Sequence, residues 1–187
     1  MTQVALLGTG LMGTPVAERL LAAGFALSLW NRTRAKLDAF AGRARLAATP
    51  ADAVGGAEVV ITLLENGEVV DAVLYRSEAI KQARAGTLVI DMSSITPAQA
   101  RAHGGICRSL GLDYVDAPVS GGTRGAAAGT LSIMAGGAPA DIDRARPLFE
   151  VLGRVTRIGE TGAGQLAKLA NQAIVGITIG AVSEALL

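Results

Sequence analysis

Short apolar runs alternate with amphipathic stretches along most of the chain. Runs that are typical of buried strands lie at residues 3–7, 26–30, 45–47, 58–64, 87–91, 112–119, 130–135 and 154–158. Between them, helical spacing, capping residues and prolines predict helices at residues 14–23, 33–40, 50–54, 69–74, 97–110 and 139–152. The glycine- and alanine-rich segment 120–129 is expected to be a loop. Strands that alternate with helices predict an α/β fold with a doubly wound, mainly parallel sheet.

Three glycines follow the first predicted strand at the spacing G-x-G-x-x-G. They are Gly8, Gly10 and Gly13, and the intervening residues include Leu11 and Met12. The motif is weak alone in a chain with 24 glycines, but here a strand precedes it and a helix follows it. The turn then brings the helix N-terminus and its unpaired N–H groups against a pyrophosphate. We therefore predict a Rossmann-type dinucleotide-binding fold.

The last predicted helix begins near residue 162 and is still running at residue 187. Its apolar side chains cover most of the helix surface, which indicates packing partners on every side. Lys168, Asn171 and Glu184 interrupt the apolar run, so we expect a buried helix and not a membrane span. The predicted organisation is a dinucleotide-binding domain at 1–161 and, at 162–187, the start of a long interdomain helix. That helix is expected to lead to a helical C-terminal domain that this chain lacks, and through that region to a homo-oligomer.

Composition excludes several classes of function. A formal net charge of +1 with no basic block argues against nucleic-acid binding. One cysteine, Cys107, permits no internal disulfide, and the first strand leaves no room for a targeting peptide, so we expect a cytoplasmic protein. No cluster of His, Cys, Asp and Glu suggests a metal site. His103, the single histidine, lies at a predicted helix end and is assigned no chemistry.

The end of the second strand indicates the cofactor. An acidic residue at this place binds the ribose hydroxyls of NAD, but here the position is Asn31, followed by Arg32 and Thr33. Arg32 can pair with a 2′-phosphate and Thr33 can donate a hydroxyl. The ordinary alternative is that Arg32 and Arg34 are solvated residues at a helix start. We favour NADP(H) over NAD(H).

Three further strand ends are candidates for ligand contacts, because ligands bind at the carboxyl ends of such strands. Leu63, Leu64 and Glu65 are expected near the adenosine or its ribose, and Ser94 near the nicotinamide ribose; capped turns are the equal alternative. Ser120 with the N–H groups of Gly121 and Gly122 can form an anion cradle for a substrate carboxylate. An ordinary glycine turn is the simpler interpretation of that last segment.

Gln165, Lys168 and Asn171 are three residues apart on the final helix and share a face. A lysine among apolar neighbours must find a partner, lower its pKa or line a wet cleft. Beside a nicotinamide, Lys168 could exchange the substrate hydroxyl proton, and Asn171 could hold the same oxygen. On the helix alone, a snorkelling surface lysine is the more ordinary interpretation.

Together these segments resemble the β-hydroxyacid dehydrogenase family, which includes 3-hydroxyisobutyrate dehydrogenases, tartronate semialdehyde reductases and NADPH-dependent glyoxylate/succinic semialdehyde reductases. The matching stretches, in order, are GTGLMGTPVA at 8–17, DMSSITP at 91–97, DAPVSGGTRGAAAGTLSIMAGG at 116–137 and GAGQLAKLANQ at 162–172. The resemblance implies Lys168 as the catalytic residue, with Asn171, Ser120, Gly121 and Gly122 holding a small carboxylate-bearing substrate and Ser94 contacting the cofactor.

The chain departs from the family pattern in two ways, and two other functions compete. Ser94 stands where the family usually has threonine, and the family's C-terminal helical domain is absent. Imine reductases share the glycine motif and the NRT segment but look different at the position of Lys168. A non-catalytic dinucleotide-binding module is the second alternative, against which the retained Lys168 argues.

Overall fold

The computed structural model describes residues 2–187. Within this range nine strands form one sheet, and their bounds are β1 Gln3–Leu7, β2 Ala26–Trp30, β3 Arg45–Leu46, β4 Val59–Thr62, β5 Leu88–Asp91, β6 Asp113–Asp116, β7 Val119–Ser120, β8 Leu131–Gly136 and β9 Gly153–Gly159. The α-helices are α1 Gly13–Ala22, α2 Pro50–Val54, α3 Gly67–Val70, α4 Pro97–Ser109, α5 Gly122–Ala128, α6 Pro139–Leu152 and α7 Ala163–Ala185. Shorter helical segments are η1 Arg34–Phe40, η2 Asp71–Arg76 and η3 Ala79–Gln82.

The sheet has the predicted doubly wound order. The strands run β3-β2-β1-β4-β5-β6-β8-β7, with β9 beside β8, and every pair from β3 to β6 is parallel. The chain reverses its direction of winding between β1 and β4, which opens a crevice at the carboxyl ends of these strands. This confirms the predicted α/β class, and β8 adds antiparallel pairs with β6 and β7.

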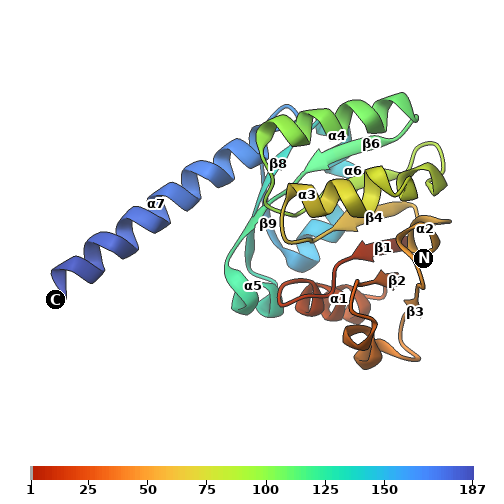
Figure 1. Cartoon of the computed structure of the whole chain (residues 1–187), viewed down its shortest axis with the longest axis horizontal. Coiled ribbons are helices and arrows are strands. Elements are labelled where there is room, and N and C mark those ends of the chain that lie inside the picture. The colour runs from red at the N-terminus through yellow and green to blue at the C-terminus, as the bar shows by residue number, and fades with distance from the viewer. Residues whose placement is uncertain (1) are drawn as a thin grey trace.

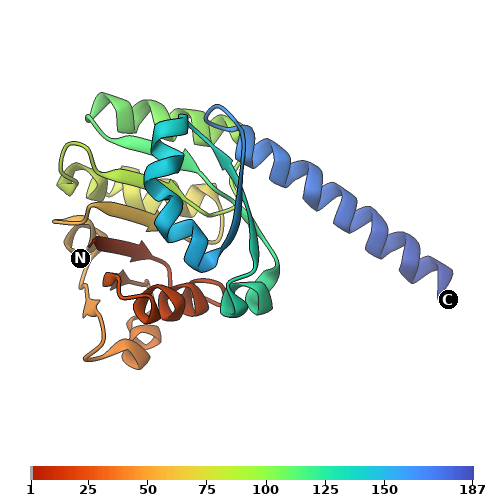
Figure 2. The same ribbon diagram turned by 180° about the vertical axis from the view of Figure 1, so that it is seen from behind.

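Helices cover both faces of the sheet, as Figures 1 and 2 show from opposite sides. Alternate side chains of β1 point to opposite faces, so Leu6 joins the core under α1 and α6, while Leu7 joins the core under α2 to α4. Because both faces are buried, the central strands are apolar at nearly every position. The two cores hold the carboxyl ends of β1, β4 and β5 at one edge.

Two sequence predictions in the region 112–129 are wrong. The expected strand over 112–119 divides into β6 and β7, because Pro118 has no N–H for the ladder and the chain turns there to pair with β8. The expected loop over 120–129 contains α5, whose alanines favour a helix that Gly129 ends in a left-handed conformation at φ 69°. Predicted helix 33–40 is the 3-10 segment η1, and Thr33 makes no side-chain cap there.

The long helix α7 leaves the body of the molecule after its first turns (Figure 1). Every residue from 172 to 187 is exposed, including Ile177, at 73% exposure. The prediction of a buried helix is therefore wrong for the chain described here, since no described element covers this part. By length and composition alone, α7 is also the one helix within residues 2–187 that could cross a membrane.

Candidate active site

The glycine turn between β1 and α1 has two glycines that the fold requires and one that it does not. A Cβ on Gly8, at φ 109°, would clash with the carbonyl oxygen of Leu63, and a Cβ on Gly13 would clash with that of Gly8. A Cβ on Gly10 would meet nothing within 4 Å. A bare Gly10 is what the close approach of a phosphate group needs. The residues present therefore fit a dinucleotide.

Thr9 gives a second indication of a ligand at this turn. Its side chain is 1% exposed, yet its Oγ1 has no hydrogen-bond partner among the described residues. Its backbone N–H donates to Asn31 Oδ1 at 3.0 Å, and Asn31 Nδ2 donates to the carbonyl of Thr33 at 3.0 Å. Asn31 thus braces the glycine turn against the end of β2, and Arg32 and Thr33 beyond it are exposed. Leu11, at 86% exposure, points away from the body.

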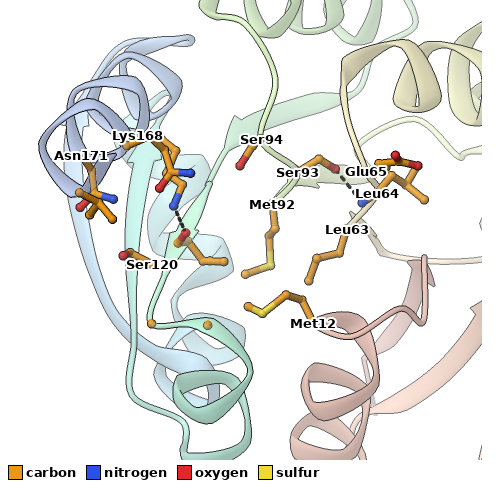
Figure 3. Close-up of a pocket in the computed structure, with 15 residues that line it drawn as sticks. Met12, Leu63, Leu64, Glu65, Met92, Ser93, Ser94, Ser120, Lys168 and Asn171 are labelled. Atoms are coloured by element: carbon orange, nitrogen blue, oxygen red, sulfur yellow. Dashed lines mark hydrogen bonds between the residues drawn. The ribbon is translucent and has the colours of Figure 1, made fainter. Parts of the chain in front are cut away.

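One pocket of about 400 Å³ collects most of the other predicted site residues (Figure 3). The predicted residues that line it are Met12, Leu63, Leu64, Glu65, Ser94, Ser120, Gly121, Gly122, Lys168 and Asn171. The sequence analysis did not single out five further lining residues, which are Met92, Ser93, Val119, Gln172 and Val175. The last two continue the helical stripe of Lys168 and Asn171, which was a usable signal.

Lys168 is buried at 9% exposure, so the interpretation as a snorkelling surface residue is wrong. Its Nζ donates a hydrogen bond to the carbonyl oxygen of Val119 at 2.8 Å. Burial lowers the pKa of this ammonium below its usual range. In Figure 3, Lys168 and Asn171 come from α7 on one side of the cavity, and Met12, Leu63 and Met92 lie across from them. The lysine therefore lies in the same pocket as Met12 of the glycine turn.

Polar groups that can bind a ligand lie around this ammonium. Asn171 Nδ2 is buried and has no hydrogen-bond partner within residues 2–187. Gly121 at φ 129° and Gly122 at φ 61° hold backbone conformations that favour glycine and follow the Ser120 hydroxyl directly. The Ser93 hydroxyl accepts a bond from Leu64 N–H at 3.0 Å and so ties two ligand-side strand ends together.

A buried polar network lies behind the 93–94 segment. Asp91 Oδ1 accepts bonds from the Thr62 hydroxyl at 2.8 Å and from Ser93 N–H at 2.9 Å. His103 lies within α4, not at its end as predicted, and pairs through Nε2 with Asp71 Oδ1 at 2.6 Å. Its Nδ1 faces Asp91 Oδ2 at 3.8 Å. Burial lowers the pKa of His103, but the two carboxylates outweigh it and raise that pKa above its usual value.

Comparison with known families agrees with this geometry. Residues 3–162 match the family described as the NAD binding domain of 6-phosphogluconate dehydrogenase. The chain belongs to this family. Within this dehydrogenase family, its relatives are dinucleotide-dependent enzymes that act on hydroxyacids. The prediction of a nicotinamide dinucleotide-binding, Rossmann-type member of the β-hydroxyacid dehydrogenases is confirmed at this level.

Individual relatives differ in substrate and cofactor. The chain is 41% identical, over its full length, to the NAD-dependent L-serine dehydrogenase of Pseudomonas aeruginosa and 38% identical, over 99% of it, to the 2-hydroxy-3-oxopropionate reductase of Escherichia coli. It spans 63% and 64% of these two relatives.

Two solved structures extend the likeness to the fold. The 3-hydroxyisobutyrate dehydrogenase of Mycobacterium tuberculosis with L-serine has a TM-score of 0.93 and 37% identity, over 99% of this chain and 64% of that one. Psf3 in complex with NADP+ and 2-OPP has a TM-score of 0.84 and 31% identity, over 96% and 68%. Members with NAD and with NADP+ thus occur among the similar proteins, so the preference of this chain is not fixed by them.

Proposed function

We propose that this chain binds NADP(H) and transfers hydride between the nicotinamide and a small β-hydroxyacid, or its semialdehyde or keto-acid partner. The observation that supports this most is the buried ammonium of Lys168, which shares one pocket with Met12 of the glycine turn. An enzyme that only needed to bind a dinucleotide would have no use for a desolvated lysine there.

In this proposal, Lys168 is the general acid and base. When bound, the nicotinamide cofactor accepts or supplies the hydride. Burial moves the pKa of Lys168 toward neutral pH, where a proton can be both taken and returned. The carbonyl of Val119, at 2.8 Å from Nζ, orients the ammonium. As hydride leaves the substrate carbon, Lys168 takes the hydroxyl proton; in the reverse direction it returns that proton to the carbonyl oxygen.

Asn171 and the 120–122 segment hold the substrate in this proposal. The unpaired Nδ2 of Asn171 donates to the oxygen that reacts. The Ser120 hydroxyl and the N–H groups of Gly121 and Gly122 accept the carboxylate. Ser94, Leu63, Leu64 and Glu65 then remain for the cofactor.

The substrate class follows from what the relatives' names have in common. L-Serine and 3-hydroxyisobutyrate each carry a primary alcohol one carbon away from the carboxylate-bearing carbon, and 2-hydroxy-3-oxopropionate carries an aldehyde there. We propose the same arrangement for this chain's substrate, because one carboxylate cradle and one lysine at a fixed separation fit it.

A substrate panel tests the reaction. The purified protein is assayed with NADPH and 2-hydroxy-3-oxopropionate, glyoxylate or succinic semialdehyde, and with NADP+ and 3-hydroxyisobutyrate or L-serine. Turnover of at least one of these acids supports the proposal. Turnover of cyclic imines alone would instead indicate an imine reductase-like enzyme, and cofactor binding without any turnover would indicate a non-catalytic module.

We also propose the surroundings in which the site works. The exposed apolar side of α7 suits packing against further helices, which we assign to a helical C-terminal domain and to a homo-oligomer. A cytoplasmic enzyme without nucleic-acid or membrane partners agrees with the net charge of +1.

A further inference from the structure

A buried carboxylate holds the beginning of α7. Asp116, at the end of β6, is 0% exposed, and its Oδ1 accepts a bond from Gly162 N–H at 2.7 Å. Its Oδ2 accepts a bond from Gln165 N–H at 2.9 Å. Both donors belong to the first turn of α7, whose N–H groups have no partner within the helix. The carboxylate therefore fixes the helix start to the sheet.

Two glycines let α7 approach the sheet closely. A Cβ on Gly136 would lie 2.6 Å from Asp116 Oδ1 and 2.8 Å from the N atom of Gly164. A Cβ on Gly164 would lie 2.8 Å from both Asp116 Oδ2 and the Asp116 carbonyl oxygen. Any side chain at either position would push the helix start away from β6 and β8.

Gln165 adds a second attachment on the other side of the helix. Its side chain is 1% exposed, with Nε2 donating to the Ser93 carbonyl at 2.8 Å and Oε1 accepting from Ile95 N–H at 3.1 Å. These two bonds join α7 to the segment that carries Ser94. A residue expected to share the ligand face with Lys168 thus acts instead as a bridge between two site-bearing segments.

These attachments end one turn before Lys168. The segment from Asp116 to Val119 holds α7 twice, through the Asp116 carboxylate at its first turn and through the Val119 carbonyl at the ammonium. We propose that Asp116 and Gln165 are positioning residues that fix the Lys168 ammonium in the pocket. This role rests on the proposed function of Lys168, but the placement of its nitrogen can be measured without turnover.

The energetics of Asp116 agree with a positioning role. Burial raises the pKa of this carboxyl, although the N–H bonds from Gly162 and Gln165 lower it. The charged form is thus disfavoured in the fold, so the site retains a carboxylate at some cost in stability. Asparagine in its place would turn an NH₂ group toward one of the two N–H donors and lose that bond.

The first test measures the reactivity of Lys168 in the protein without added cofactor. Wild type, Asp116→Asn, Gln165→Met and Asp113→Asn are labelled with an amine-reactive reagent over a pH series, and modification of Lys168 is followed by mass spectrometry. Asp113 is the matched control, since it lies on β6 but pairs with Arg144 at the surface. Loosening of the first turn lets water reach the ammonium. We therefore expect the labelling midpoint of Lys168 to rise in both site variants and its labelling to become several-fold faster at fixed pH.

The opposite outcomes are distinct. A purely electrostatic effect of removing the Asp116 charge would lower the midpoint, and a merely structural role would lower the melting temperature without moving it. Either result overturns the proposal. Should Asp116→Asn not fold, Gln165→Met decides alone, because it keeps the carboxylate and removes only the bridge.

A second measurement separates this proposal from the proposed function. If the wild type turns over an acid of the panel, both site variants should lose at least tenfold in kcat with NADPH affinity within about threefold, and Asp113→Asn should match wild type. If the wild type is inactive, the proposed function fails while the labelling result still stands. A kcat unchanged in both variants contradicts the positioning role.

Discussion

Gly10 and Gly13 lie three residues apart in one turn, yet different neighbours restrict them. Around Gly10 the protein leaves open space, whereas Gly13 faces the carbonyl oxygen of Gly8. We expect Gly10→Ala to keep wild-type stability and to weaken NADPH binding at least tenfold, because its methyl occupies phosphate space. We expect Gly13→Ala to destabilise the fold by about 1–3 kcal/mol. Urea unfolding and NADPH fluorescence titration check both, and a Gly10→Ala variant with unchanged affinity would contradict the fit to a dinucleotide.

Arg32 carries the prediction of cofactor preference. It is exposed directly after β2, beside Asn31, and no carboxylate stands there to repel a 2′-phosphate. Arg32→Ala should reduce the ratio of NADPH to NADH affinity by at least tenfold, since a charge-assisted pair is lost for one cofactor alone. Lys36→Ala, an exposed cation one turn further on, serves as control and should leave the ratio within about twofold. A wild-type preference for NADH would refute the assignment.

The residues that sequence could predict were those in local motifs. The glycine turn, the 120–122 segment and the Lys168 face each depend on spacing within a few residues, and the structure brings Met12, Ser120 and Lys168 into one pocket. The role of Asp116 could not be predicted, because its partners lie 46 and 49 residues away. Burial of Lys168 likewise depends on tertiary packing, so the helix alone favoured a surface residue.

At the scale of elements, local propensity was sufficient wherever a buried strand or a capped helix repeated its pattern. It failed at β6, β7 and α5, where Pro118 and two glycines obscured a short strand and a short helix. There the pairing with β8 decides the conformation, and that pairing is non-local. Position within the sheet, more than composition, therefore sets the segment that lines the pocket.

His103 joins three elements and predicts how stability depends on pH. It connects α4 to Asp71 of η2 and faces Asp91 of β5, and it stacks on Tyr75 with ring centroids 4.2 Å apart. Tyr114 and Cys107 complete its surroundings. Because the folded state raises the pKa of His103, its contribution is fully present below the unfolded value near 6.5 and is lost as pH rises through the folded pKa.

Urea unfolding over a pH series checks this prediction. Wild-type stability should decline over the interval above pH about 6.5, and His103→Gln should flatten the decline, since no proton is then released. The neighbouring groups do not titrate there, because burial raises the pKa values of Tyr75, Tyr114 and Cys107, the last to about 11. An equal decline in the variant would show that another group is responsible.

The whole molecule presents a long apolar helix beyond its folded body. Ile177 on α7 is 73% exposed, and such a surface in water favours association. We expect the protein to sediment as a homo-oligomer, and Ile177→Glu to shift it to smaller species. Ala140→Glu, an exposed position at the start of α6, is the matched control and should leave the distribution unchanged. A monomeric wild type would contradict association through α7.

The central claim, that Lys168 does chemistry beside a nucleotide held by the glycine turn, has one direct test. NADPH affinity, turnover and unfolding free energy are measured for wild type and Lys168→Met. Removing a desolvated ammonium and its bond to Val119 should change stability by no more than about 1 kcal/mol, because the two effects oppose each other. We predict NADPH affinity within about threefold of wild type and turnover reduced at least 100-fold. A variant that keeps turnover within tenfold, or that no longer binds NADPH, would contradict the account.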